Sequence, residues 1–212
     1  IHKYVRCITG NDDNLKRVLD YLDNEKLTED TIVIYTSDQG YWLGQHGFYD
    51  KRLILETSMR MPFLIRYPRV IKPGKVNKEL CINVDLAPTL LGLAGLKAPP
   101  TMQGRSMIPL LKGKVPSDWR QSQFYTYWGA PNHYGIRTKR YTYLKLEGHT
   151  AELFDRETDP DQVHNVAANT ENKPIVKQLE AELQKQIREV NIKQDELPSS
   201  SKDKGKKRKT RK

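Results

Sequence analysis

The hydrophobic positions at the start of the chain form two different patterns. Apolar side chains within residues 11–26 recur at Leu15, Val18, Leu19 and Leu22. This spacing of i, i+3, i+4 and i+7 predicts an amphipathic helix. Residues 31–36, TIVIYT, form a continuous β-branched and apolar run, which is typical of a strand covered on both faces in a parallel sheet. A helix, a short turn and a buried strand in this order favour an α/β fold.

The same alternation continues to about residue 115. PFLIRY, residues 62–67, predicts another strand, and the following Pro68 ends it. VDLAPTLLGLAG, from Val84, predicts a short helix with Asp85 near its start and Gly95 at its end. The next stretch is rich in Pro and Gly and predicts a connection that leaves the α/β layer. We therefore assign residues 1–115 to an α/β domain.

Short aromatic and β-branched runs replace this pattern after residue 116. FYTYW, HYGIRTK, RYTYLKL and AELFD predict the strands of an antiparallel sheet. Residues 173–190 carry one apolar face and predict a helix that packs on this sheet. We assign residues 116–196 to a small domain of antiparallel sheet and helix. From residue 197 to 212 the chain is rich in Ser, Lys and Arg, so we predict a disordered basic tail.

The charge of the chain is concentrated in this tail. The whole chain carries a net charge of +10, of which residues 202–212 contribute +7 and residues 1–201 only +3. We interpret the tail as a solvated end, with electrostatic docking to a polyanion as the functional alternative. Two cysteines, Cys7 and Cys81, are too few for a disulfide framework, and either two thiols or one bridge fits them. No apolar run approaches the roughly 20 residues of a membrane span.

The end of the strand at residues 31–36 carries the first candidate chemistry. Asp38 and Gln39 follow it directly, and ligands of open α/β sheets gather at the carboxyl ends of strands. A carboxylate and an amide carbonyl are hard oxygen donors, which suit Ca²⁺ or Mg²⁺. Two such residues do not fill a calcium shell of about six to eight oxygens, so other ligands would come from elsewhere. The alternative is that Asp38 starts a turn and Gln39 is simply polar.

The segment after Gln39 adds glycines and two basic side chains. Gly40, Gly44 and Gly47 permit positive φ and close backbone approach. His46 is compatible with contact to an anion or with an ordinary loop position. Lys51 offers a point charge to an anionic substrate, or is a solvated surface group. The residues alone thus indicate a hard-metal, anion-handling site and no specific reaction.

Longer motifs in this region resemble the sulfatase family of the alkaline-phosphatase-like fold. The resemblance starts with SDQGYWLGQHGFYDKR and ETSMRMPFLIRYP, and continues through NVDLAPTLLGLAG, MQGRSMIPLLKG, YGIRTKRYTYLK and ELFDRETDPDQVHN. The resemblance covers nearly all of residues 4–190, in the order of the family. Bacterial glycan sulfatases and the iduronate and glucosamine sulfatases are the most similar in pattern. The implied fold is the C-terminal portion of an α/β/α sandwich, followed by a small α+β domain with an antiparallel sheet and a C-terminal helix.

The resemblance implies roles for five residues. Asp38 and Gln39 match the positions at which the family binds one Ca²⁺ ion. Lys51 matches the lysine that binds the substrate sulfate, and His46 lies in the segment near the leaving group. His133 matches a position from which the smaller domain reaches the substrate sugar.

One motif of the family is missing from the 212 residues. Sulfatases carry C-x-P-S-R, whose cysteine becomes the formylglycine nucleophile, and neither Cys7 nor Cys81 lies in that context. The resemblance therefore implies that the chain is the C-terminal part of a sulfatase of sulfated carbohydrate. In the whole enzyme hydrated formylglycine would attack the sulfur. We expect no sulfate-ester turnover from this chain by itself. The family is usually exported, which implies a periplasmic or secreted protein.

Two other classes of function stay open at the level of sequence. The first is a phosphodiesterase or phosphatase of the same superfamily, which a lone Thr or Ser nucleophile would indicate. The second is a non-enzymatic polyanion-binding protein, which the basic tail permits. No nucleic-acid-binding motif is present, so a specific nucleic-acid partner is not expected.

Overall fold

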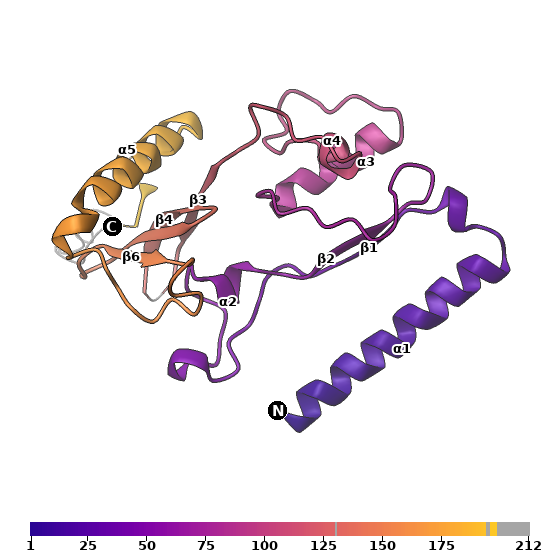
Figure 1. Cartoon of the computed structure of the whole chain (residues 1–212), viewed down its shortest axis with the longest axis horizontal. Helices are drawn as coiled ribbons and strands as arrows, with labels where there is room; N and C mark the ends of the chain where they lie inside the picture. Colours follow the sequence, from indigo (N-terminus) through magenta and orange to yellow (C-terminus); the bar gives the residue numbers. More distant parts are fainter. Residues whose placement is uncertain (130, 194–195, 199–212) are drawn as a thin grey trace, which may run out of the picture. The chain divides into compact units, whose positions relative to one another are not determined.

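A computed structural model describes residues 1–129, 131–193 and 196–198 of the chain (Figure 1). The chain forms two compact units. The first unit contains residues 1–38 and 61–119, and the second contains residues 39–60 and the described residues from 120 onward. A segment from the first half of the chain therefore folds with the second half.

The first unit begins with a long helix, α1 (His2–Asn24). The predicted helix is confirmed, and it starts nine residues earlier than the predicted start at residue 11. None of its residues is buried, and Val18, in the predicted apolar stripe, is 51% exposed. A short 3₁₀-helix, η1 (Thr28–Asp30), follows, and Asp23 of α1 binds Arg66 at 2.8 Å. The apolar face of α1 is therefore not buried against other described residues.

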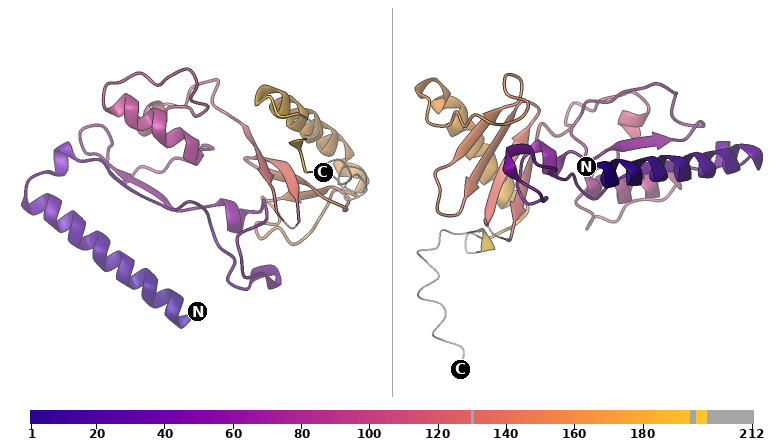
Figure 2. Two further views of the ribbon diagram at one scale, coloured as in Figure 1. Left: turned by 180° about the vertical axis from the view of Figure 1, so that it is seen from behind. Right: turned by 90° about the horizontal axis from the view of Figure 1, so that it is seen from below.

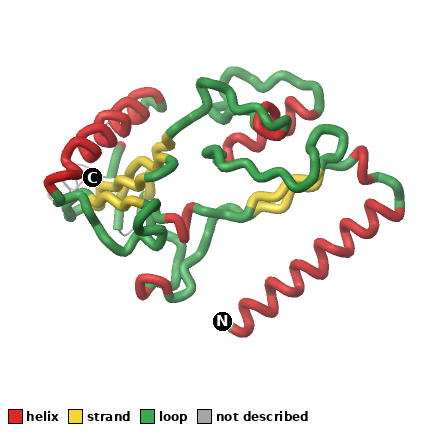
Figure 3. The backbone as a smooth tube through the Cα atoms, in the orientation of Figure 1, coloured by secondary structure: helices red, strands yellow, loops and turns green. Residues whose placement is uncertain are grey.

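The two strands of this unit correct one prediction. Strand β1 (Val33–Thr36) pairs antiparallel with β2 (Phe63–Arg66), and no parallel neighbour occurs in the described part of the chain. Tyr35 in β1 is 37% exposed and Leu64 in β2 is 63% exposed. The expectation of a parallel strand covered on both faces is therefore wrong for the described residues. The physical reason is that residues 37–62 reverse the direction of the chain, so that β2 runs antiparallel beside β1. Figure 3 shows that this connecting segment is mostly loop.

A small helical core completes the first unit. Helix α3 (Leu86–Leu93) follows the 3₁₀-helix η3 (Asn83–Asp85), which confirms the predicted short helix. Asp85 is fully buried, and its carboxylate accepts the backbone N–H groups of Ile82 and Arg105, both within 2.9 Å. The predicted connection contains one further helix, α4 (Ile108–Leu111), whose Leu110 packs with Met107 and Trp119.

The second unit contains the predicted antiparallel sheet. Its strands are β3 (Ser122–Tyr127), β4 (His133–Thr138), β5 (Tyr141–Leu146) and β6 (Glu152–Asp155), paired in this order. Every pairing is antiparallel, and the register places Tyr127 opposite His133. The alternating aromatic and β-branched residues therefore form the sheet that they predict.

Helix α5 (Lys173–Glu189), preceded by the 3₁₀-helix η4 (Thr170–Asn172), covers one face of this sheet, as two views in Figure 2 show. Its buried residues, Leu179, Leu183 and Ile187, lie in a cluster with Ile136 of β4 and other side chains of the sheet. The predicted C-terminal helix is confirmed.

The predicted tail lies mostly outside the described residues. Its first residue, Leu197, is described and is only 3% exposed, in the same core as α5. Residues 199–212 lie outside the described residues, so their state stays a prediction. Cys7 and Cys81 are not joined by a disulfide. None of the described helices combines the length and apolar character needed to cross a membrane.

Candidate functional site

The predicted site residues that follow β1 lie on a segment that closes on itself. We call residues 40–58 the closed loop. The Gly40 N–H donates to the Ser58 carbonyl at 2.7 Å, and the Trp42 N–H donates to the Asp50 carbonyl at 2.7 Å. A Cβ atom on Gly40 would lie 2.0 Å from the Thr57 carbonyl oxygen. The loop can therefore close only with glycine at its start, because no side chain fits between the two backbone segments.

Trp42 is the hydrophobic centre of the closed loop. It is 1% exposed and packs with Leu55 of the loop and with Leu144 and Phe154 of the sheet. Its indole N–H donates to the Ser58 hydroxyl at 2.6 Å, so the polar atom of the ring is also paired. The closed loop and the four-stranded sheet consequently share one core.

His46 makes the first polar contact between the closed loop and the rest of its unit. It lies in the 3₁₀-helix η2 (Gln45–Gly47) with φ of 53°, after Gly44 with φ of 113°. Its Nε2 atom lies 2.7 Å from the Asp161 carbonyl oxygen. A carbonyl only accepts hydrogen bonds, so Nε2 carries the proton and donates it. The imidazole ring is exposed and stands edge-on to Trp42.

His133 makes the second contact and is fully buried at the start of β4. The backbone N–H of Ile54 donates to its Nε2 atom at 3.1 Å. Its Nδ1 atom lies 2.7 Å from the Pro131 carbonyl oxygen, to which it donates. These two bonds require the neutral ring with the proton on Nδ1. Burial also lowers the pKa of His133 from its ordinary value, although the Pro131 hydrogen bond opposes this shift.

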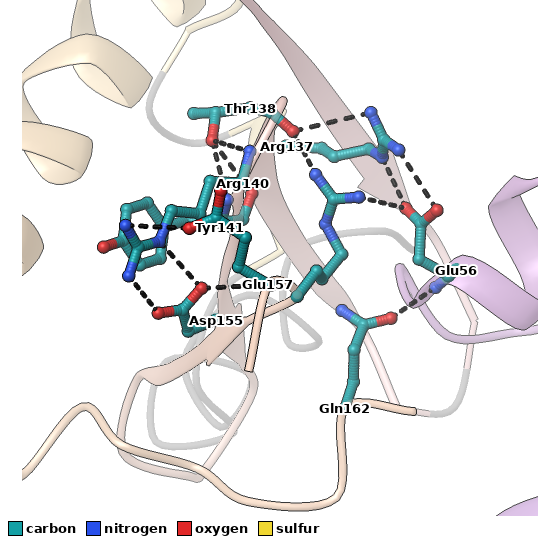
Figure 4. Close-up of polar contacts among 9 residues, drawn as sticks. Glu56, Arg137, Thr138, Arg140, Tyr141, Asp155, Glu157 and Gln162 are labelled. Carbon is teal, nitrogen blue, oxygen red and sulfur yellow. Dashed lines mark hydrogen bonds and ion pairs between the residues drawn. The ribbon is translucent and has the colours of Figure 1, made fainter. Parts of the chain in front are cut away.

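Glu56 makes the third contact, at the start of α2 (Glu56–Met59), and Figure 4 shows it. Its carboxylate accepts two hydrogen bonds from the Arg137 guanidinium, the Nη2 bond measuring 3.1 Å. Arg156 Nη1 lies 3.6 Å from the same carboxylate. The Gln162 side chain accepts the Glu56 backbone N–H at 2.6 Å. We call Glu56, Arg137 and Arg156 the guanidinium cluster.

The guanidinium cluster is largely shielded from solvent. The side chains of Glu56, Arg137 and Arg156 are 17%, 19% and 11% exposed. Burial alone would raise the pKa of Glu56, but the hydrogen bond and charge of Arg137 outweigh it and hold that pKa below its ordinary value. Glu56 therefore stays ionised at neutral pH and neutralises one of two adjacent positive charges.

Lys51 lies between these contacts and faces solvent. Its backbone N–H donates to the Asp50 carboxylate at 2.7 Å, and Asp50 also binds Arg52 at 2.6 Å. The Lys51 ammonium forms no ion pair with any described residue. It is thus a positive charge available to an external anion on a loop that is fixed at three places.

The structure places the five predicted site residues in two groups. His46, Lys51 and His133 belong to the second unit, together with Gln39, whereas Asp38 ends the first unit. Asp38 is exposed and its carboxylate accepts the Ser37 hydroxyl at 3.2 Å; Gln39 is half-buried. No group of three or more His, Cys, Asp or Glu side chains suited to a metal occurs in the part of the chain that is described.

The sequence motifs contain Glu56, Arg137 and Gln162, but sequence reasoning assigns them no role. The available signal was the charge of Arg137 and Arg156 within or beside strands that are otherwise apolar and aromatic. Charged residues in such positions are paired when they are buried. The identity of the partner is not visible in sequence, because Glu56 is 81 residues from Arg137.

Comparison with protein families gives a match over most of the chain. A family model described as N-sulphoglucosamine sulphohydrolase, C-terminal, matches residues 44–189. The chain is also 38% identical over 200 residues to an N-acetylglucosamine-6-O-sulfatase of Bacteroides thetaiotaomicron. That alignment covers 88% of this chain and 36% of the relative, so the chain spans little more than a third of the relative's length.

Solved structures give the same result. One, of a protein in complex with its substrate D-glucosamine-2-N,6-O-disulfate, matches with a TM-score of 0.83 and 36% identity over 87% of this chain and 40% of that one. The phosphonate monoester hydrolase of Agrobacterium radiobacter matches with a TM-score of 0.74 and 27% identity, over 84% of this chain and 39% of that one. The chain therefore belongs to the sulfatase family and matches the C-terminal region of its members.

Proposed function

We propose that the protein to which this chain belongs hydrolyses sulfate esters of a sulfated carbohydrate, and that this chain supplies part of the substrate site. The observation that carries the proposal is the Lys51 ammonium, exposed and without an ion pair among the described residues, on a loop within the matched family region. The support for a sugar substrate is the set of relatives, among them a structure solved with a disulfated glucosamine.

Lys51 would bind the sulfate group of the substrate. A lysine ammonium is a compact point charge that suits the oxygens of an anion. In the transition state negative charge accumulates on the transferring group and on the leaving oxygen, and a fixed positive charge stabilises it. His46, whose Nε2 atom donates to the Asp161 carbonyl, would lie toward the leaving-group side.

His133 has a geometry that does not support direct contact with the sugar. The residue is fully buried, and both of its ring nitrogens are hydrogen-bonded within the protein. We therefore leave the sugar contact that the sequence predicts for His133 out of this proposal.

Asp38 and Gln39 would contribute two ligands to a bound Ca²⁺ ion. Their carboxylate and amide oxygens are of the hard type that Ca²⁺ requires, so the donor chemistry of the chain fits the ion. The two side chains are too few to complete a shell of about six to eight oxygens. When bound, the ion would supply further positive charge at the sulfate oxygens. The missing ligands would come from outside this chain.

The nucleophile would also come from outside the 212 residues, because they contain no C-x-P-S-R motif. Its expected form is formylglycine, which supplies the oxygen that attacks sulfur. We accordingly expect no turnover from the chain alone. Export to the periplasm or the medium is part of the same proposal and rests on the resemblance to a family that is usually exported.

The test is a sulfate-release assay with glucosamine 6-sulfate. It compares the 212-residue chain with a fusion in which the N-terminal part of the Bacteroides relative precedes this chain. We expect release from the fusion alone, and a loss of about 100-fold in the fusion carrying Lys51→Ala, since one electrostatic contact to the transition state is removed. Metal-dependent release by the isolated chain, or full activity of the Lys51→Ala fusion, would contradict the proposal.

Phosphonate or phosphate ester hydrolysis is the second candidate function. The match to the phosphonate monoester hydrolase favours it, because that enzyme shares the fold over 84% of this chain. The same fusion tested on phenyl phosphonate and phenyl phosphate monoesters separates the two functions. Faster hydrolysis of a phosphorus ester than of the sulfate would favour this candidate.

A further inference from the structure

We propose that Glu56, on the closed loop, and His133, on the four-stranded sheet, are positioning residues whose contacts hold the Lys51 segment in place. The inference rests on the proposed function, in which Lys51 binds the sulfate. Neither Glu56 nor His133 is free to touch a substrate: His133 is fully buried, and the Glu56 carboxylate is held by the guanidinium cluster. Their effect on the site therefore acts through the closed loop.

The first step is that Lys51 lies in sequence between two contacts that join the closed loop to the rest of the second unit. His46 binds the Asp161 carbonyl on one side of it, and Ile54 binds His133 on the other. Lys51 is three residues from Ile54, so their Cα atoms lie within about 11 Å of each other at full extension. Few residues of chain therefore separate Lys51 from each of these two contacts, which are made to Asp161 and His133.

The second step is that the His133 contact acts on the backbone of the closed loop. The Ile54 N–H has a buried acceptor only while His133 is neutral and its Nε2 is unprotonated. Removing that acceptor leaves a buried N–H group without a partner, which is costly for the closed state of the loop. The part of the closed loop between Lys51 and Ile54 would then be more mobile.

The third step concerns the charge balance of the guanidinium cluster. Arg156 Nε and Gln162 Nε2 are already buried without a hydrogen-bond partner among the described residues. The cluster is therefore short of acceptors, and Glu56 is the carboxylate that faces both guanidinium groups. Removing its charge leaves two adjacent positive groups at the start of α2, which repel each other and weaken the attachment of the loop.

The experiment uses the isotopically labelled 212-residue chain and two measurements. The first is hydrogen–deuterium exchange of the amides of residues 51–55, compared with the amides of α5 as a test of the fold. The second is NMR titration with glucosamine 6-sulfate, followed on the Lys51 amide, with unsulfated glucosamine as the ligand control. Lys51→Ala defines how much of the affinity depends on the sulfate contact.

Three variants and one matched control test the positioning role. Glu56→Gln removes the charge, His133→Ala removes the acceptor, and His133→Gln restores an acceptor at a similar distance from the backbone. Arg140→Gln is the control. Arg140, in the turn between β4 and β5, forms a comparable two-bond pair with Asp155, and its ion pairs among the described residues are with Asp155 and Glu157, outside the closed loop (Figure 4).

Positioning predicts a distinct set of results. Glu56→Gln and His133→Ala should speed exchange at residues 51–55 about tenfold without changing α5, as local opening does. Both should weaken binding of glucosamine 6-sulfate about fivefold, because the bound conformation of the loop is then less populated. His133→Gln should recover most of the affinity, and Arg140→Gln should behave as the unmodified chain.

Two failures of the experiment have different meanings. If the unmodified chain and Lys51→Ala show equal affinity for the sulfated sugar, the proposed function fails, and with it the inference. If Lys51→Ala loses affinity while Glu56→Gln and His133→Ala retain it, only the positioning role is overturned. Equal loss of protection in α5 for Glu56→Gln also overturns it, because the residue would then support the whole fold.

Discussion

At the scale of single residues, the closed loop depends on a few groups with specific roles. Gly40 has no side chain, which leaves room for the backbone of Thr57 to pass close to it. Trp42 fills the core that the closed loop shares with the sheet. His133 accepts a backbone hydrogen bond through one specific tautomer. Sequence reasoning identified Gly40 and His133 as candidates, but neither backbone partner could be predicted, because Ile54 is 79 residues from His133.

Gly40→Ala should destabilise the second unit. The added Cβ atom would lie 2.0 Å from the Thr57 carbonyl oxygen, so the backbone must move and the Gly40–Ser58 hydrogen bond weakens. We expect a loss of about 2–3 kcal/mol in the free energy of unfolding, measured by urea denaturation. Gly10→Ala is the control: it has open space in the middle of α1 and should gain about 0.5–1 kcal/mol. An unchanged urea midpoint for Gly40→Ala would contradict the close approach.

The stability of the second unit should fall as the pH decreases below about 6.5. Burial lowers the pKa of His133 in the folded state from its ordinary value of 6.5. The unfolded chain then binds the proton first, so the stabilisation is complete above the unfolded pKa and is lost as the pH falls toward the folded pKa. Glu56 does not interfere in this window, because its pKa lies below its ordinary value.

Urea midpoints between pH 7.5 and pH 5, together with NMR titration of the His133 ring, measure this effect. His133→Gln should flatten the pH profile, since glutamine does not titrate. A His133 ring that titrates above pH 6.5 would reverse the expected sign and contradict the lowering of its pKa by burial.

At the scale of elements, local pattern predicts the second unit better than the first. The strands β3 to β6 and helix α5 occur where the sequence predicts them, since each combines a strong periodicity with a face that the described residues cover. For β1 the sequence predicts a strand but not its partner. The apolar run of residues 31–36 carries no information on strand direction, which depends on how the following loop closes.

Leu183→Ala should strongly destabilise the packing of α5 on the sheet. The side chain is 0% exposed in the largest described core, and truncation removes contacts and leaves a cavity. We expect a cost of about 2–5 kcal/mol in the free energy of unfolding. Gln178→Ala on the exposed side of the same helix is the matched control and should stay within about 0.5 kcal/mol. Similar costs for both variants would contradict the described orientation of α5.

At the scale of the whole molecule, the chain forms two units, and one segment of its first half folds with the second unit. Residues 39–60 follow β1 of the first unit but fold with the sheet of the second. The loop that carries His46 and Lys51 is therefore attached to a sheet that is assembled from residues 120 and beyond. Within the proposed sulfatase function, this attachment makes the small sheet part of the substrate site.

The basic tail gives a prediction for the whole chain that does not depend on the described structure. Residues 202–212 carry a net charge of +7, so binding to a sulfated polysaccharide should weaken steeply with salt. Deletion of these residues should remove the salt-dependent binding while leaving the thermal unfolding midpoint unchanged. Equal binding with and without the tail, measured by affinity chromatography, would show that the tail does not dock to polyanions.

The sequence alone determined the family and the sheet-and-helix architecture of the second unit, and it predicted which residues are offered to an anion. These features follow from local periodicity and from short motifs, each of which lies within a few residues of chain. Only the tertiary structure decided the antiparallel pairing of β1, the buried state of His133 and the guanidinium cluster around Glu56. Those features join residues far apart in the chain, and the partner of a buried charge or backbone group is chosen by packing rather than by its neighbours in sequence.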